Sequence, residues 1–170
     1  FVSITEQVSE YLFLTVKIKQ DIQKVSEKFP LRIPEFYLNL MDHENPSCPL
    51  RRQSVPLKDE LVRSGHTDPL EEQNFLITPS LIKKYPKRGV FLATSTCAMY
   101  CRFCNRRRLV GKHWNPQLTW DESFRHMERD KDLTEVIVSG GDPFTLSGKD
   151  FSNMMKNLRS IERIQVIRIS

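Results

Sequence analysis

Apolar residues recur at steps of three and four through the first thirty positions, a spacing typical of an amphipathic helix. The stripe consists of Tyr11, Leu14, Ile18, Ile22, Val25 and Phe29. Ser3 and Glu6 have the spacing of a capping box at the start of this helix, and Pro30 ends it. Shorter helices are predicted over 35–41 and 58–63, on either side of a proline-containing stretch.

The pattern changes near residue 88, where short runs of β-favouring residues begin to alternate with helical patterns. Strands are predicted over 90–94, 135–139 and 164–169. The two helices between them have predicted caps (Thr119 with Glu122, and Ser147 with Asp150) and apolar faces (Trp120, Phe124 and Met127; Phe151, Met154 or Met155, and Leu158). Because the crossovers are long enough for parallel pairing, we predict an α/β fold: a helical region over 1–87, then a βαβαβ unit over 88–170.

Parallel α/β sheets place their chemistry in the loops that follow the carboxyl ends of the strands. A loop with three cysteines follows the first predicted strand, and the turn Gly140-Gly141-Asp142-Pro143 follows the second. We therefore expect both loops to face one site.

Composition supports a packed domain. The chain has 170 residues, of which 39% are hydrophobic and 28% charged, with ten Pro and six Gly, so a disordered or low-complexity chain is excluded. Its apolar runs are far shorter than the ~20 residues of a membrane span, and no secretory signal pattern precedes them, so a cytoplasmic location is expected. Because it starts at Phe1 and its final strand ends without a cap, the chain reads as a segment of a longer protein.

The charge is concentrated in one stretch. The net charge is +5 at pH 7, and between Gln73 and Trp120 there are nine basic residues and no acidic one. The nine are Lys83, Lys84, Lys87, Arg88, Arg102, Arg106, Arg107, Arg108 and Lys112. Such a stretch can be a solvated face, or it can bind nucleic acid or small anions.

Three of the four cysteines lie inside the basic stretch, as Cys97-x3-Cys101-x2-Cys104. This spacing favours a metal over disulfides, because an odd number of thiols cannot pair completely and the expected compartment is reducing. Structural zinc needs a fourth ligand, for which His113 is the nearby candidate, whereas an iron–sulfur cluster held by three cysteines leaves one iron open to a small molecule. Inert buried cysteines are a third interpretation, which the neighbouring arginines disfavour; Cys48 is expected to be structural.

The words around these cysteines resemble the lysine 2,3-aminomutase family of radical S-adenosylmethionine (SAM) enzymes. The matching words are Tyr85-Pro86-Lys87-Arg88, the run from Cys97 to Arg108, Ser139-Gly140-Gly141-Asp142, Val166-Ile167-Arg168-Ile169 and a stretch over 38–56. The resemblance runs from about residue 31 to the end. It implies that the βαβαβ unit is the first part of a partial (β/α) radical SAM barrel, truncated here.

The resemblance also implies roles for individual residues. Cys97, Cys101 and Cys104 would hold a [4Fe-4S] cluster whose open iron is chelated by SAM. Phe103 would pack by the adenosyl group, and Ser139, Gly140, Gly141 and Asp142 would bind the SAM amino group. Arg106 would pair with the substrate carboxylate. Lys84, Tyr85 and Arg88 would hold the phosphate of pyridoxal 5′-phosphate (PLP), with Lys84 standing where many relatives have Arg.

The implied reaction is the migration of an amino group from the α- to the β-carbon, which gives β-lysine if L-lysine is the substrate. Glutamate, or a protein-bound lysine of a translation factor, is the alternative substrate. In relatives the PLP-binding lysine lies beyond the position of Ser170, so this segment alone is expected to be inactive. The expected partners are a small-molecule amino acid and a second copy of the chain, with neither nucleic acid nor a membrane.

A function of another class stays open at this point: a zinc-bearing, basic nucleic-acid-binding module. Its basis is the basic stretch, with Tyr100, Phe103 and Trp114 as residues on which bases would stack. Iron and sulfide content separates it from the cluster enzyme.

Overall fold

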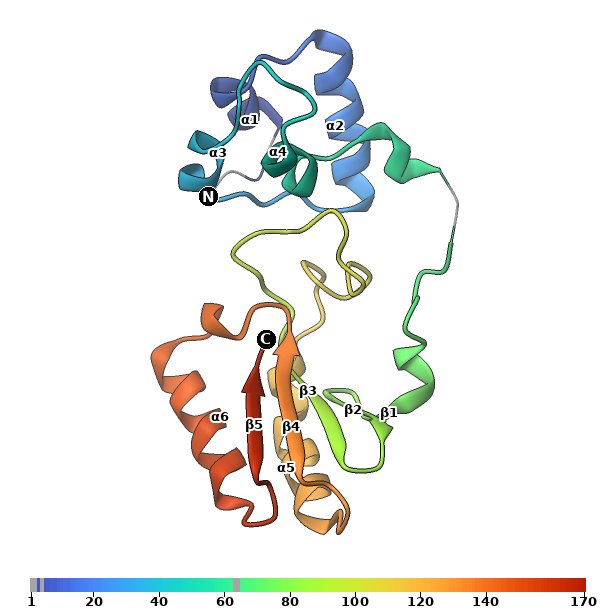
Figure 1. The fold of residues 1–170 in the computed structure, drawn as a ribbon, viewed down its shortest axis with the longest axis vertical. Helices are drawn as coiled ribbons and strands as arrows, with labels where there is room; N and C mark the ends of the chain where they lie inside the picture. The colour runs from blue at the N-terminus through green and yellow to red at the C-terminus, as the bar shows by residue number, and fades with distance from the viewer. Residues whose placement is uncertain (1–2, 4, 63–64) are drawn as a thin grey trace. The chain divides into compact units, whose positions relative to one another are not determined.

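The computed structural model describes residues 3, 5–62 and 65–170. Its contacts divide the chain into two compact units, Phe1–His66 with Ala98–Arg107, and Thr67–Cys97 with Arg108–Ser170 (Figure 1). These bounds differ from the predicted division at residue 87. Residues 67–87 belong to the second unit, and the middle of the cysteine loop, Ala98–Arg107, belongs to the first. Each unit is described by itself.

The first unit is helical, as predicted. It contains α1 (Thr5–Tyr11), α2 (Val16–Lys28), α3 (Glu35–Asn39), α4 (Pro49–Ser54) and a 3-10 turn, η1 (Lys58–Leu61). Its core includes the buried side chains of Val8, Ile22, Ile33, Leu38 and Val55, and Cys48 is buried among them, which fits a structural thiol. The turn η1 lies where a short helix was predicted over 58–63.

The long helix predicted through residue 29 is two helices, so the prediction of one continuous element is wrong. Residues 12–15 interrupt the helix, and Thr15 caps α2 by accepting a hydrogen bond from the backbone N–H of Ile18. A threonine that satisfies an exposed N–H group in this way stabilises a new helix start. At the start of α1, the backbone N–H of Ser3 donates to Oε1 of Gln7, rather than to the predicted partner Glu6.

The second unit is a mixed α/β structure around a five-stranded sheet. The strands are β1 (Leu76–Thr78), β2 (Leu81–Tyr85), β3 (Arg88–Thr94), β4 (Glu135–Gly140) and β5 (Val166–Ile169), in the order β1-β2-β3-β4-β5. The helices α5 (Trp120–Arg129) and α6 (Gly148–Ser160) connect β3 to β4 and β4 to β5, and both of these pairs are parallel. The predicted βαβαβ order is confirmed.

The strands β1 and β2 were not predicted, so the prediction of a helical region is wrong over 76–85. Both strands pair antiparallel, β1 with β2 and β2 with β3. Their shortness explains the failure, because three and five residues give too few alternations to define a period. Three further 3-10 turns are η2 (Glu72–Phe75), η3 (Pro116–Thr119) and η4 (Pro143–Thr145).

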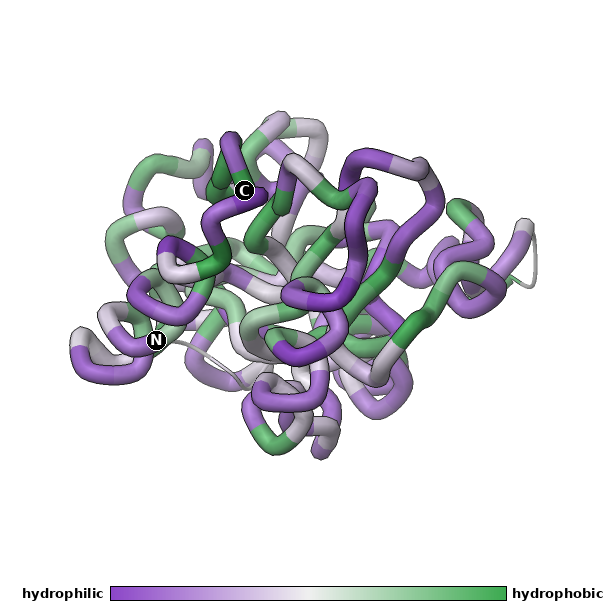
Figure 2. Tube along the Cα trace, turned by 90° about the horizontal axis from the view of Figure 1, so that it is seen from below, coloured by the Kyte–Doolittle hydropathy of each residue, from purple (hydrophilic) through white to green (hydrophobic). Residues whose placement is uncertain are grey.

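Helices α5 and α6 pack on the same face of the sheet. The core there combines Phe91, Ala93, Val136 and Val138 of the strands with Trp120, Phe124, Met127, Met154 and Leu158 of the helices. Side chains alternate along a strand, so Arg88, Val90 and Leu92 of β3 and Glu135, Ile137 and Ser139 of β4 lie on the other side, which we call the second face. Figure 2 colours the trace by hydropathy, with hydrophobic stretches in green and hydrophilic stretches in purple.

One of the two predicted helix caps in this unit is confirmed. The Ser147 hydroxyl accepts the backbone N–H of Asp150 at 3.0 Å at the start of α6. The predicted cap at Thr119 is wrong, because its side chain makes no hydrogen bond to the helix start; the Ser80 hydroxyl and the carbonyl of Pro116 lie within hydrogen-bond distance of its hydroxyl instead. In the described part of the chain, every helix is too short or too polar to cross a lipid bilayer.

Candidate functional site

The ends of β3 and β4 bring the two predicted loops together within the second unit. Thr94, at the end of β3, is in register with Gly140 at the end of β4. The backbone N–H of Gly141 donates to the carbonyl of Thr94 at 2.6 Å, and that of Asp142 to the carbonyl of Thr96 at 2.8 Å. The start of the cysteine loop is thus fixed against the Gly-Gly-Asp turn, as parallel pairing predicted.

Both glycines of this turn are required by backbone packing. Gly140 has φ +110°, and a Cβ there would lie 2.6 Å from the carbonyl oxygen of Thr94. A Cβ on Gly141 would overlap the carbonyl group of Thr96. Because these neighbours are backbone atoms, they have no side-chain freedom with which to move away. Glycine is therefore what allows the two loops to approach this closely.

Asp142 is held in a fixed orientation by the turn that it begins. Its Oδ1 accepts the backbone N–H of Phe144 at 3.0 Å, which caps η4. Ser139, the other polar residue of the predicted SAM motif, is only 8% exposed at the end of β4. The buried Ser139 is thus followed directly by the two glycines and then by the Asp142 carboxylate.

Cys97 directly follows the segment that is bonded to the turn. The backbone N–H of Thr96 donates to the Thr94 hydroxyl, and the Ser95 hydroxyl donates to the carbonyl of Trp114 at 2.6 Å. The backbone N–H of Gly111 also donates to the carbonyl of Ser95. The exit from β3 is therefore anchored on both sides just before the half-buried thiol of Cys97.

Cys101 and Cys104 belong to the first unit, in the middle of the cysteine loop. The backbone N–H of Cys104 donates to the carbonyl of Cys101 at 3.2 Å, and Cys104 Sγ accepts the backbone N–H of Arg106 at 3.4 Å. Burial raises the pKa of the Cys101 thiol, and the nearby Cys104 raises it further. The loop thus presents two half-buried sulfur atoms, one of which already accepts a backbone N–H.

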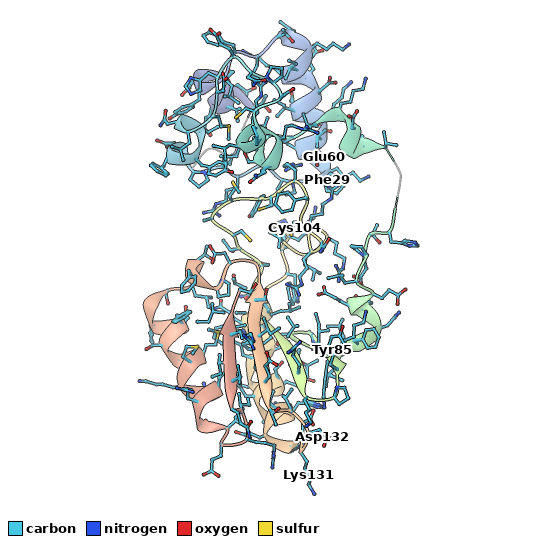
Figure 3. The ribbon with its side chains drawn as sticks, in the orientation of Figure 1. Phe29, Glu60, Tyr85, Cys104, Lys131 and Asp132 are labelled. Atoms are coloured by element: carbon cyan, nitrogen blue, oxygen red, sulfur yellow. The ribbon has the colours of Figure 1, made fainter. Side chains whose placement is uncertain are left out.

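A mostly buried ion pair holds this part of the loop to the helical unit. Arg102 donates from Nε and Nη2 to the two carboxylate oxygens of Glu60, at 3.0 and 2.8 Å. Arg107 donates to the same carboxylate at 3.1 Å, and its guanidinium lies 3.6 Å from the centre of the Phe29 ring. Figure 3 labels Glu60, Phe29 and Cys104. Sequence reasoning missed Glu60, which no motif singled out.

The donor set suits a soft metal centre. None of the four cysteines forms a disulfide, and the three of the motif are half-buried on an irregular loop. Over the residues that the structure describes, His, Cys, Asp and Glu side chains form no group of three or more arranged for a metal ion. His113, the candidate fourth zinc ligand, is exposed. The assignment of the three cysteines as metal ligands stays a prediction.

The other residues of the predicted site lie at several places. Phe103 is 69% exposed, and Arg106 is half-buried beside Cys104. Lys84, Tyr85 and Arg88 surround the β2–β3 turn, whereas the Gly-Gly-Asp turn follows the opposite ends of the parallel strands. The Lys84 ammonium donates to the carbonyl of Leu70 at 3.2 Å. The structure therefore does not bring the predicted PLP residues to the Gly-Gly-Asp turn.

Arg88 instead belongs to a charged triad on the second face. Its Nε donates to Oε2 of Glu135 at 2.7 Å, and Nε of Arg168 donates to Oε1 of the same carboxylate at 2.5 Å. These hydrogen bonds, from Arg168 first and Arg88 second, lower the pKa of the Glu135 carboxyl. No motif predicts a role for Glu135, and Arg168 belongs only to the matching word Val166-Ile167-Arg168-Ile169.

The triad predicts a dependence of stability on pH. Because the folded-state pKa of Glu135 is depressed below its ordinary value of 4.5, its contribution is present above that value and is lost as the pH falls through the folded-state pKa. We expect the difference in unfolding free energy between the unmodified chain and Glu135→Gln to shrink in acid. Urea unfolding over a pH series measures it, with the exposed Glu128→Gln as control. A difference that stays constant into acid would contradict the role of this carboxylate.

Comparison with known proteins gives a consistent family. L-lysine 2,3-aminomutases from Bacillus subtilis (strain 168) and Acetoanaerobium sticklandii are each 34% identical to the chain, over 96% and 99% of its length. The chain belongs to the lysine 2,3-aminomutase-like family of radical SAM enzymes. A glutamate 2,3-aminomutase from Clostridioides difficile (strain 630) is 29% identical over 96% of the chain. No family model matches.

The chain spans about two fifths of the length of these aminomutases: 36% and 42% of the two lysine enzymes and 40% of the glutamate enzyme. All three relatives are named as aminomutases, which are isomerases. Membership of the aminomutase-like family confirms the resemblance carried by the cysteine motif and the words around it.

The basic stretch of this aminomutase-like chain is largely paired with acids from outside the stretch. Arg102 and Arg107 pair with Glu60, and Arg108 pairs with Asp68 and Glu72. Lys83 pairs with Asp130, and Arg88 with Glu135. A cationic face that binds nucleic acid needs several basic groups whose terminal nitrogens are available to phosphates. Four of the nine, Lys83, Arg102, Arg107 and Arg108, pair with acids through their terminal nitrogens, which favours the enzyme over the nucleic-acid module.

Proposed function

We propose that this chain provides the cluster- and SAM-binding part of an amino-acid 2,3-aminomutase that converts L-lysine to β-lysine. The observation that carries the proposal is the pair of backbone hydrogen bonds from Gly141 and Asp142 to Thr94 and Thr96. They place the Gly-Gly-Asp turn next to the residue before Cys97. A ligand that binds both the turn and a metal at the cysteine loop would need this adjacency.

In this proposal Cys97, Cys101 and Cys104 hold a [4Fe-4S] cluster. Their support is the spacing along one loop, the absence of a disulfide at any of the three and the N–H donated to Cys104 Sγ. When bound, the cluster would supply the electron for cleavage of SAM, and PLP would carry the migrating nitrogen. Hydrogen bonds to sulfur and neighbouring positive charge tune the potential of such clusters, and the Arg106 N–H and the Arg102 and Arg107 side chains would contribute here.

The Gly-Gly-Asp turn would bind the SAM amino group. The glycines allow a ligand to approach the backbone, and Asp142 keeps Oδ2 to accept from an ammonium while Oδ1 bonds to Phe144. Ser139 would line the same place, and Phe103 would cover the adenine. Each role is a further proposal that a single substitution tests.

Lysine is the preferred substrate because the matched lysine enzymes are 29% to 34% identical to the chain, whereas the glutamate enzyme is at the lower end of this range, at 29%. Arg106 would pair with the substrate carboxylate, a task that suits a planar two-pronged donor. Lys84, Tyr85 and Arg88 would hold the PLP phosphate. Four cysteines without a disulfide fit the reducing cytoplasm that we propose as the location.

We further propose that the sheet belongs to a partial radical SAM barrel. The sequence β3-α5-β4-α6-β5 has both helices on one face, which is the arrangement of the repeated units in an α/β barrel. In such a barrel the second face is the interior. The edge of β5 would be covered by a further strand or by a second copy in a homo-oligomer.

Metal analysis tests the proposal. Anaerobically purified full chain is expected to contain about four irons and as much sulfide. Cys97→Ala should lose most of this iron, whereas Cys48→Ala, which removes a buried thiol outside the motif, should retain it. Iron that is retained in Cys97→Ala would contradict the proposed cluster ligands. Colourless protein with stoichiometric zinc would contradict the cluster and favour the nucleic-acid-binding module.

A further inference from the structure

We propose that Arg88 and Arg168, both anchored on Glu135, form a site for a phosphate monoester on the second face of the sheet. The inference rests in part on the proposed function, because Arg88 is one of the residues assigned to the PLP phosphate. It adds two residues, Glu135 and Arg168, that the proposed function does not use. It also gives Glu135 a role, to position two arginines.

The sheet brings these residues together from three strands. Arg88 is at the start of β3, Glu135 at the start of the middle strand β4, and Arg168 on β5. The side chain of Glu135 is only 14% exposed, whereas those of Arg88 and Arg168 are 47% and 62% exposed. One mostly buried carboxylate thus holds two accessible guanidinium groups by its two oxygens.

The way in which the arginines are held leaves their outer nitrogens for a ligand. Each guanidinium donates to Glu135 through Nε. Among residues 3, 5–62 and 65–170, no acceptor is hydrogen-bonded to the Nη atoms of Arg88 or Arg168. The Nη pair of a guanidinium matches two oxygens of a phosphate or carboxylate. The anchoring also restricts the movement of both side chains before a ligand binds.

The charge favours a phosphate monoester. Two guanidinium groups and one carboxylate leave a net charge of +1, so an anion is attracted even with Glu135 ionised. A phosphate monoester carries about −1.5 to −2 charges and three acceptor oxygens, enough for both arginines at once. A carboxylate offers one charge and two oxygens. The phosphate can belong to PLP or to another source, and binding measurements separate these.

A purely structural ion pair is the simpler alternative. Exposed ion pairs contribute little to stability. A structural pair would also show no response to phosphate. The test therefore reads ligand binding rather than stability.

The experiment uses Arg168→Gln in the full chain, with the exposed Arg159→Gln of α6 as a matched control. The probes are PLP, pyridoxal, which lacks the phosphate, and inorganic phosphate as competitor. Dissociation constants come from tryptophan fluorescence and from the absorbance of the pyridine ring. We expect Arg168→Gln to weaken PLP about 10- to 100-fold and to leave pyridoxal unchanged.

Each outcome decides the inference. Weaker PLP with unchanged pyridoxal supports the site with the PLP phosphate as its ligand, and weaker inorganic phosphate with unchanged PLP supports a site for another phosphate. The inference is overturned if Arg168→Gln leaves the affinities for PLP and for inorganic phosphate unchanged. It is also overturned if Arg159→Gln weakens these affinities as much as Arg168→Gln does. Iron measured on the same samples reports on the cluster independently, so failure of the proposed function is distinguished from failure of this site.

Discussion

Replacing Gly141 by alanine is expected to lower the free energy of unfolding by about 3 kcal/mol or more. The added Cβ would overlap the carbonyl group of Thr96, which is backbone and cannot turn away as a side chain would. Relief of the overlap requires β3 and β4 to separate at their carboxyl ends, which breaks the bond from Gly141 to Thr94. Urea unfolding followed by circular dichroism measures the change.

The control for this substitution is Gly148→Ala. Gly148 is the first residue of α6, and nothing lies within 4 Å of a Cβ built on it. Alanine is also the better helix former, so this variant should be as stable as the unmodified chain or slightly more stable. If Gly141→Ala unfolded at the same urea concentration as Gly148→Ala, the close packing of the two loops would be contradicted.

Replacing Glu60 by glutamine is expected to destabilise the first unit by about 3 kcal/mol or more. The carboxylate accepts from Arg102, from Arg107 and from the backbone N–H of Leu57. The Arg102 side chain is only 7% exposed, so its charge would lose its partner in a largely dry environment. Urea unfolding measures the loss of stability. Limited proteolysis should show that the first cleavage falls within residues 98–107.

Asp59→Asn is the matched control, because Asp59 is the neighbouring acid in η1 and is exposed. Its substitution should change the free energy of unfolding by less than about 0.5 kcal/mol. Equal effects of the Asp59 and Glu60 substitutions would show that net charge, and not the buried pair, stabilises the cysteine loop.

Local patterns predicted the elements whose signals are local. The buried strand before Gly140 and the cap at Ser147 followed from a few consecutive residues, and both are confirmed. The break at residues 12–15 was missed because the apolar stripe continues through it, so periodicity alone cannot distinguish one helix from two. The cap predicted at Thr119 failed because a tertiary partner, Ser80, competes for the hydroxyl.

The parts of the site that could be predicted are those whose positions follow from the order of strands and loops along the chain. Parallel topology was enough to place the start of the cysteine loop, up to Cys97, beside the Gly-Gly-Asp turn. The partners Glu60 and Arg102 are 42 residues apart, and no spacing rule connects them. The triad needs three strands in register, and only the observed pairing shows that Glu135 lies between Arg88 and Arg168. Residues joined by tertiary contacts alone were thus not predictable.

The most direct measurement of the central claim is electron paramagnetic resonance of the reduced, oxygen-free full chain, before and after SAM is added. The account predicts a cluster spectrum that shifts with SAM, with the same shift in Cys48→Ala and no cluster signal in Cys97→Ala. A cluster spectrum that SAM leaves unchanged would contradict an open iron next to the Gly-Gly-Asp turn.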